Sequence, residues 1–424
     1  MDGRIYDAYV EILKEELVPA MGCTEPIAIA YAAAVARETL GNTPKTVRIS
    51  ASGNIIKNVK SVVVPNTGGL RGIAAAAAAG NVAGKAEKKL EVLAEITKEE
   101  IEEISDYLKI VPFQITASDS KCIFDIYVEV QDEEHSAEVQ IQGHHTNIVQ
   151  IRKNGETLFG KEYSEDENCT GTDRHLLNVE QIITFANEVK ISDVKETIER
   201  QIEYNMAIAQ EGLRGNWGAN IGKILLQSYG NSVQNRAKAM AAAGSDARMN
   251  GCEMPVVINS GSGNQGMTAS LPVIVYAEDM QVSRETLIRA LVVSNLVSIH
   301  LKTGIGTLSA YCGAISAGCG AGAGITYLYG GGYTEVAHTI VNALAINSGV
   351  VCDGAKASCA AKIASAVEAG TLGMKMYQFG SQFYGGDGIV ATGIEETIAN
   401  VGQLARDGMR ETDKKIIEIM IDKI

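Results

Sequence analysis

Small residues dominate the last third of this 424-residue chain, where they surround two pairs of cysteines with the same spacing. The first pair is Cys312 and Cys319, and the second is Cys352 and Cys359. The segments around them, AYCGAISAGCGAGAG and VVCDGAKASCAAKIASAVEAG, contain few bulky side chains. Because the chain has 44 glycines and one tryptophan, it predicts a fold of tight helix contacts rather than one of aromatic packing.

The seven-residue spacing places both thiols of a pair on the same side of a helix. Clustered thiols among small residues favour an iron–sulfur cluster over zinc, whose ligands usually come as closely spaced pairs. The spacing matches no standard ferredoxin pattern. From the residues alone two interpretations stay open: the thiols hold a cluster, or they are buried and act as small apolar side chains.

Charge and cysteine content narrow the setting of the protein. The chain has 37 basic and 51 acidic residues, a formal net charge of −14, which argues against nucleic acid or an anionic membrane as a partner. The first twenty residues have the pattern of an acidic amphipathic helix and not of a signal peptide. Eight cysteines without an export signal predict a reducing cytoplasm and thiol or metal chemistry instead of disulfides.

Residues 303–334 carry no charge, so their length alone would allow a membrane span. They contain ten glycines along with several Ser, Thr and Tyr residues, which makes their net hydrophobicity low. This composition predicts a buried glycine-rich helix and loop in the core.

The hydrophobic pattern divides the chain into three parts and predicts an α+β fold. Residues 1–44 are predicted as N-terminal helices that pack on the C-terminal part, the second of them over about 26–40. Residues 45–165 are predicted as an α+β domain with an antiparallel sheet. Residues 166–424 are predicted as a mainly helical domain.

Within the middle part the pattern changes several times. Residues 45–65 predict a strand, a Gly-Asn turn and a second strand. An alanine-rich helix and a charged helix around 87–108 follow. Residues 111–159 predict an antiparallel meander with Asn154-Gly155 as a hairpin turn. The acidic stretch 162–173 is the predicted boundary of the helical domain.

Cys23 lies just before a predicted helix, in the segment MGCTEPIAIA. Thr24 is the predicted N-cap, and Pro26 fits the first turn, where a missing N–H costs nothing. A thiol at the positive end of a helix dipole should ionise more readily than a free cysteine, as a catalytic base or nucleophile must. The alternative is a half-buried structural thiol.

Two glycine-rich loops are candidates for binding a small anion. Residues 259–266, NSGSGNQG, offer backbone N–H groups with the side chains of Ser260, Ser262 and Asn264, which suit a carboxylate. Residues 65–72, PNTGGLRG, are similar. Glycine-rich turns are also common without any ligand. The first loop follows no Rossmann-type unit, which argues against a dinucleotide.

Histidines and lysines offer less. His144 and His145 fall next to each other in a predicted strand, where neighbouring side chains point to opposite faces and do not chelate one metal. His300 and His338 are predicted to be core or capping residues. No lysine is a convincing partner for pyridoxal phosphate, so that cofactor is not expected.

Taken together, MGCTEPIAIA, INSGSGNQG and the run CDGAKASC after Cys312 resemble the L-cysteine desulfidase family. That family is related to the α-chain of iron–sulfur L-serine dehydratases, and the resemblance covers essentially the whole chain. It implies a [4Fe–4S] cluster held by Cys312, Cys352 and Cys359, with one iron open to substrate. It makes Cys23 the base and Cys319 a bystander, and it places the iron–sulfur catalytic centre in the helical domain.

The resemblance implies a carbon–sulfur lyase that converts L-cysteine to hydrogen sulfide, pyruvate and ammonia by β-elimination. Loop 259–266, with Asn66 and Thr67 helping, would hold the substrate carboxylate while the Cys23 thiolate removes the α-proton. An L-serine dehydratase with the same cluster remains an alternative. So does a non-enzymatic iron–sulfur redox sensor, and a structural zinc protein is a further one.

Other points stay open at this stage. The expected partner is a small amino-acid substrate, with neither nucleic acid nor membrane, and the composition is compatible with a homodimer. Cys122 and Cys169 are interpreted as structural. The sequence does not reveal the purpose of the β meander or the pathway that the protein serves.

Overall fold

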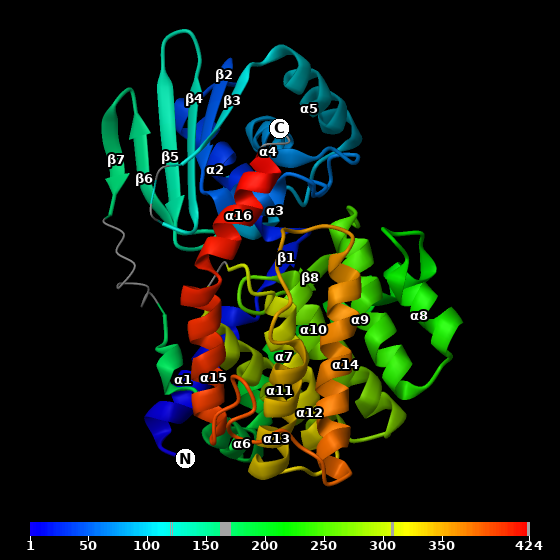
Figure 1. The fold of residues 1–424 in the computed structure, drawn as a ribbon. Helices are drawn as coiled ribbons and strands as arrows, with labels where there is room; N and C mark the ends of the chain where they lie inside the picture. The colour runs from blue at the N-terminus through cyan, green and yellow to red at the C-terminus, as the bar shows by residue number, and fades with distance from the viewer. Residues whose placement is uncertain (119, 121, 162–170, 307–308, 422–424) are drawn as a thin grey trace.

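A computed structural model of the chain describes residues 1–118, 120, 122–161, 171–306 and 309–421. These residues build two bodies, each around its own large hydrophobic core. We call residues 24–160 the sheet body and residues 3–16 with 174–408 the helical body; Figure 1 shows the first above the second. The predicted α+β class with a mainly helical C-terminal part is confirmed.

The sheet body contains a six-stranded mixed sheet. Its strands are β2 (Thr46–Ala51), β3 (Phe113–Ala117), β4 (Asp125–Gln131), β5 (Ser136–Gln142), β6 (Ile148–Lys153) and β7 (Glu156–Gly160), in the order β3-β2-β4-β5-β6-β7. All neighbours are antiparallel except β2 and β3, which run parallel, so the prediction of a purely antiparallel sheet is wrong at this edge. The segment between β2 and β3 is long and helical, as a parallel crossover requires.

Two turns of this body bear on the sequence predictions. Asn154 and Gly155 join β6 to β7 with φ of +51° and +80°, which confirms the predicted two-residue hairpin turn. The predicted turn and second strand after β2 are wrong, because Gly53–Val59 forms the helix α3. Burial decides the outcome here: all residues of α3 after Gly53 are buried, which overrides the β-propensity of its isoleucines and valine.

Helices cover the sheet and complete its core. They are α2 (Thr24–Leu40), α3, α4 (Gly72–Ala83), the 3₁₀ helix η1 (Ala86–Glu91) and α5 (Lys98–Ile110). Helices α2 and α4 cross so closely that a Cβ at Gly80 would lie 2.2 Å from the Ala30 carbonyl oxygen. The single charged helix predicted around residues 87–108 is instead two helices, η1 and α5. Helix α5 begins at a capping box formed by Thr97 and Glu100.

The helical body is built from α1 and the C-terminal half of the chain. Its elements are α1 (Gly3–Glu16), η3 (Arg174–Leu176), α6 (Val179–Glu188), α7 (Ile191–Arg214), α8 (Ile221–Tyr229), α9 (Val233–Met249), α10 (Gly263–Asp279), α11 (Arg284–Ile305), α12 (Gly313–Leu328), α13 (Tyr333–Asn347), α14 (Cys359–Gln378), α15 (Ile394–Gln403) and the π-helical η4 (Leu404–Gly408). The predicted segment 1–44 is divided between the bodies. Helix α1 joins the helical core, whereas α2 packs on the sheet, because it is buried along nearly its whole length between the strands and α4.

Glycines set the spacing inside the helical body. A Cβ at Gly318 on α12 would lie 2.4 Å from the Ala366 carbonyl oxygen on α14, and one at Gly370 would lie 2.3 Å from the Gly318 carbonyl oxygen. This confirms the prediction of tight helix contacts. The uncharged segment 303–334 contains α12, which is buried along nearly its whole length, as the sequence predicts. Within the described ranges, no helix is both long and apolar enough to cross a membrane.

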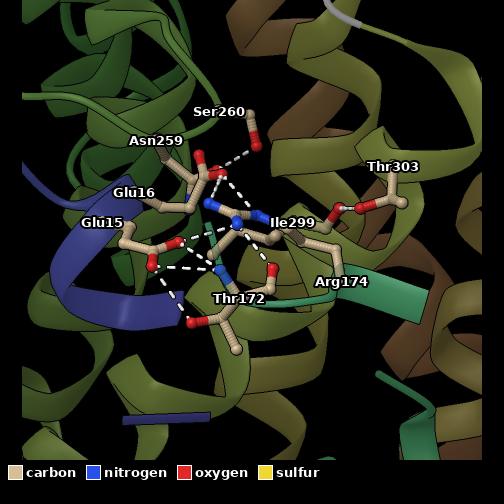
Figure 2. Close-up of polar contacts among 8 residues, drawn as sticks. All are labelled: Glu15, Glu16, Thr172, Arg174, Asn259, Ser260, Ile299 and Thr303. Carbon is tan, nitrogen blue, oxygen red and sulfur yellow. Dashed lines mark hydrogen bonds and ion pairs between the residues drawn. The ribbon is translucent and has the colours of Figure 1, made fainter. Parts of the chain in front are cut away.

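Three sets of contacts link segments that are far apart in the sequence. The strands β1 (Pro19–Met21) and β8 (Pro255–Val257) pair antiparallel between the two bodies. Helix α16 (Arg410–Ile421) reaches from the helical body to α3, where Lys57 and Asp413 form an ion pair of 2.5 Å. Figure 2 shows the third: Arg174 and Thr172 bind the carboxylates of Glu15 and Glu16 at the end of α1.

The predicted boundary between residues 165 and 166 lies outside the described residues. So do most of the acidic stretch 162–173 and Cys169.

Candidate active site

A cavity of about 110 Å³ lies where the two bodies meet. Three groups of predicted site residues line it: the thiol of Cys23, the loop residues Ser260, Ser262 and Asn264, and the thiols of Cys312, Cys352 and Cys359. Residues far apart in the sequence are thus brought to one place. Cys23 lies directly before the sheet body, and the others come from the helical body.

An isolated antiparallel bridge brings two of the cysteines together. Tyr311 pairs with Val351, and the amides of Cys312 and Cys352 donate to the carbonyls of Val350 (3.1 Å) and Ala310 (2.6 Å). The two cysteines therefore sit on neighbouring backbone segments, before helices and not within them.

Cys359 opens helix α14, while Cys312 is the N-cap of α12. The prediction that each pair shares one side of a helix is therefore wrong. Cys312 precedes α12, which contains Cys319, and Cys352 precedes α14, which begins at Cys359. Cys319 lies inside α12, is 1% exposed and does not line the cavity. It is part of the helical core.

Burial governs the protonation of these thiols. It raises the pKa of Cys312 to about 12, with a further contribution from the neighbouring Cys352. Burial also raises the pKa of Cys359. Lys302, 6% exposed on α11, lines the same cavity, and burial lowers its pKa to about 8 although Cys352 and Cys312 act in the opposite direction. The thiols of Cys312 and Cys359 thus favour the neutral form unless a positive centre binds them.

The donor set fits an iron–sulfur cluster. Three thiols share one cavity with the ammonium groups of Lys302 and Lys362, and thiolates are the usual ligands of such clusters. The lysines would offset the negative charge of the ligands. Among the described residues, no three His, Cys, Asp or Glu side chains are grouped so that they could hold a single metal ion.

Cys23 is the N-cap of α2, so the predicted cap at Thr24 is wrong by one residue. The Cys23 thiol donates to the Glu25 carboxylate, with Sγ and Oε2 3.1 Å apart. Burial raises the pKa of Cys23 well above its ordinary value, Glu25 raises it further, and Arg248 opposes both. The prediction that the helix N-terminus eases its ionisation is therefore wrong in this environment, because burial outweighs the dipole.

Glu25 is held in place by several donors. The Asn58 amide donates to Oε1 at 3.0 Å, while the Cys23 thiol and the Thr24 hydroxyl donate to Oε2. The Thr24 hydroxyl also lies 3.0 Å from the Gly261 carbonyl oxygen, so this network reaches the glycine-rich loop. The Glu25 carboxylate therefore fixes the orientation of the Cys23 thiol in the cavity.

The glycine-rich loop forms a tight turn ahead of α10. The backbone groups of Asn259 and Ser262 pair at 3.1 Å, and Ser260 and Gly261 adopt φ of +49° and +75°. The Ser260 hydroxyl donates to the Asn259 side chain at 2.9 Å (Figure 2). Ser262 is the N-cap of α10 but makes no side-chain cap, so the N–H groups of the first turn are left for another acceptor.

Asn66 and Thr67 do not line the cavity. The Asn66 amide donates to the Leu93 carbonyl at 2.7 Å, and the Thr67 hydroxyl donates to the Val64 carbonyl at 2.7 Å. Both side chains are buried and stabilise the turn between α3 and α4. The other predicted site residues therefore line the cavity, whereas Asn66 and Thr67 lie outside it.

Sequence reasoning assigned no role to several buried residues of the cavity, among them Arg248 and His145. Burial lowers the pKa of His145 to about 4, and its Nε2 has no partner within the described part of the chain. A single arginine in a helix gives no signal of burial. For His145 the only hint was its place next to His144, in a loop that the structure sets beside Gly261.

Comparison with known proteins gives a consistent family. Residues 87–418 match the family described as serine dehydratase alpha chain. A UPF0597 protein of Desulfitobacterium hafniense (strain Y51) is 62% identical over 99% of this chain and 98% of its own length. UPF0597 proteins of Lachnoclostridium phytofermentans and Treponema denticola are 52% and 47% identical, over 99% of this chain and 100% and 99% of their own lengths. The predicted relation to the α-chain of iron–sulfur L-serine dehydratases is confirmed.

Proposed function

This chain belongs to the serine dehydratase alpha chain family, and on that premise we propose that it is an iron–sulfur lyase acting on L-cysteine. The products of the proposed β-elimination are hydrogen sulfide, pyruvate and ammonia. The observation that carries the proposal is the cavity that Cys23 shares with Cys312, Cys352 and Cys359. A base and a set of cluster ligands around one small cavity suit proton abstraction coupled to loss of a leaving group.

In this proposal Cys312, Cys352 and Cys359 hold a [4Fe–4S] cluster. When bound, the cluster supplies a Lewis acid that polarises the bond between Cβ and the leaving group.

The glycine-rich loop orients the substrate. Its free N–H groups at the start of α10, with the Ser262 hydroxyl, suit a carboxylate. The Ser260 hydroxyl donates to the Asn259 side chain and holds the turn of the loop. Held at both ends, the substrate reacts from one orientation.

Cys23 moves the proton. In its thiolate form it takes the α-proton of the substrate, and the hydrogen bond to Glu25, 3.1 Å away, orients the thiol that results. The electron pair of the Cα–H bond forms the Cα–Cβ double bond as the Cβ–S bond breaks and sulfide leaves. The released 2-aminoacrylate then tautomerises and hydrolyses to pyruvate and ammonia without further help.

L-serine is the second candidate substrate, and the family description favours it. Hydroxide is a poorer leaving group than hydrosulfide, so serine would demand more assistance in the same cavity. The sequence Cys23-Thr24-Glu25-Pro26, which matches the desulfidase pattern, supports L-cysteine.

The test is product release from L-cysteine by anaerobically iron-reconstituted protein, with L-serine in parallel. Equal amounts of sulfide and pyruvate from cysteine, formed faster than pyruvate from serine, would support the proposal. Faster pyruvate release from serine would move the substrate to the second candidate. No product from either amino acid, from protein that holds its cluster, would reject the lyase and favour the sensor.

A further inference from the structure

Arg248 is a buried cation without a buried anion beside it. It lies on α9, is 3% exposed and lines the cavity. Its Nη1 donates to the Asn264 side-chain oxygen at 3.2 Å, and its Nε has no partner in the described part of the chain. Nor does any carboxylate of the described residues form an ion pair with it. A buried guanidinium in this state is costly, which indicates that a ligand completes it.

The guanidinium lies at the N-terminus of α10. A Cβ at Gly263 would come within 2.4 Å of the Arg248 Nε, so glycine is required at this first helical residue. Because Ser262 provides no side-chain cap, the arginine and the uncapped N–H groups converge on the same end of the cavity. Gln265, in the same first turn, is 6% exposed and its Oε1 is also unpartnered among the described residues.

Apart from Lys57, which pairs with Asp413, the lysine and arginine cations that line the cavity divide into two sets. Lys302 and Lys362 interact electrostatically with Cys312 and Cys352. Arg248 instead interacts with Cys23 and with His145. The two lysines therefore lie near the proposed cluster ligands, whereas Arg248 lies near Cys23, the proposed base.

We propose that Arg248 and the N-terminus of α10 form the subsite for the α-carboxylate of the substrate. A guanidinium offers two parallel donors that match a carboxylate, and the helix N-terminus adds donors and positive potential. The subsite restricts the enzyme to amino acids with a free carboxylate. It rests on the proposed function for the identity of the substrate, but binding through it needs no turnover.

The test is calorimetric binding of L-alanine, which lacks a leaving group, to the iron-loaded protein. L-alaninamide, which keeps the amine but lacks the carboxylate, is the matched ligand. Wild type should prefer L-alanine, and Arg248→Met should weaken L-alanine binding by about 10- to 100-fold while leaving L-alaninamide unchanged. Arg248→Lys, which keeps the charge and loses the paired donors, should fall between.

Arg236→Met is the control, since Arg236 lies on the same helix, carries the same charge and does not line the cavity. It should bind both ligands as wild type does. The subsite is rejected if wild type does not prefer L-alanine, or if Arg248→Lys and Arg248→Met, shown to be folded by thermal melting, keep that preference.

Kinetics separate this inference from the proposed function. For L-cysteine, Arg248→Met should raise KM more than it lowers kcat, because it removes a contact to an unreacting group. A wild type that prefers L-alanine through Arg248 yet releases no product would reject the lyase and leave the subsite standing. Unchanged KM for L-cysteine in Arg248→Met would reject the subsite and leave the lyase standing.

Discussion

The two walls of the cavity differ in how their polar groups are satisfied. On the sheet-side wall, Glu25 accepts hydrogen bonds from Asn58, Thr24 and Cys23 and is complete without a ligand. On the helical-side wall, Arg248 is buried and its Nε has no partner among the described residues. The hydrogen bonds around Glu25 on the first wall are thus complete and suit the handling of a proton at Cys23, whereas Arg248 on the second wall still lacks a partner for its Nε.

The largest expected effect comes from breaking the helical-side wall at its thiols. Cys312→Ser, Cys352→Ser and Cys359→Ser should each lower iron content after reconstitution and abolish pyruvate release, because each removes a proposed ligand. Iron and pyruvate are measured on the same samples. Cys319→Ala is the matched control: it should keep both, since Cys319 lies outside the cavity. Full iron loading in the three serine variants would contradict the ligand assignment.

A smaller effect should appear on the sheet-side wall as a pH dependence of stability. His145 has a pKa of about 4 when folded, below the ordinary value of 6.5. Between these values the unfolded chain binds the extra proton, so stability is full above pH 6.5 and falls as pH drops toward 4. The loss should reach about 3 kcal/mol, at about 1.4 kcal/mol per unit.

Denaturant unfolding of wild type and His145→Gln between pH 4 and 7 measures this loss. The variant should show a flatter profile. His175→Gln, at an exposed position, should follow wild type. Identical slopes for wild type and His145→Gln would show that His145 is not the source.

A third prediction tests whether helix spacing in the helical body places the thiols. Gly318→Ala puts a methyl 2.4 Å from the Ala366 carbonyl oxygen and should cost about 1–3 kcal/mol of stability through overpacking. It should also reduce iron loading, because α12 and α14 carry Cys312 and Cys359 at their starts. Gly3→Ala, where nothing lies within 4 Å, is the control and should leave both unchanged. Unchanged stability of Gly318→Ala would mean that the two helices separate freely.

The smallest expected effect concerns the link between the bodies. Asp413→Ala leaves Lys57, whose side chain is 1% exposed, without its ion-pair partner and should lower stability by about 1–2 kcal/mol. The Glu411–Lys414 pair on the same helix is exposed, so Glu411→Ala should cost less than about 0.5 kcal/mol. Equal losses in the two variants would deny Lys57 a role in holding α16.

Sequence motifs predicted the cavity better than they predicted its details. Cys23, the loop residues and the three C-terminal cysteines were found because each lies in a short, distinctive pattern. Asn66 was included because its loop resembles the other one, yet its side chain binds a backbone carbonyl instead. Loop composition does not reveal which way a side chain points.

Long-range packing explains the rest of the failures. Arg248 looks like a surface residue in sequence, and only the folding of α10 against α9 buries it. The sequence predicts a turn at Gly53-Asn54 and a strand after it because β-branched residues favour strands, but burial between α16 and the sheet body makes residues 53–59 helical. The raised pKa of Cys23 likewise depends on burial, which no local pattern encodes.

The most direct test of the division between the walls uses iron-loaded Cys23→Ala. L-cysteine is added anaerobically, and the visible spectrum of the cluster and pyruvate release are recorded together. We expect a spectral change on substrate binding with turnover reduced by about 10²- to 10⁴-fold, because only the proton acceptor is lost. Wild-type turnover would show that Cys23 is not the base, and loss of the cluster would show that Cys23 is needed to hold it.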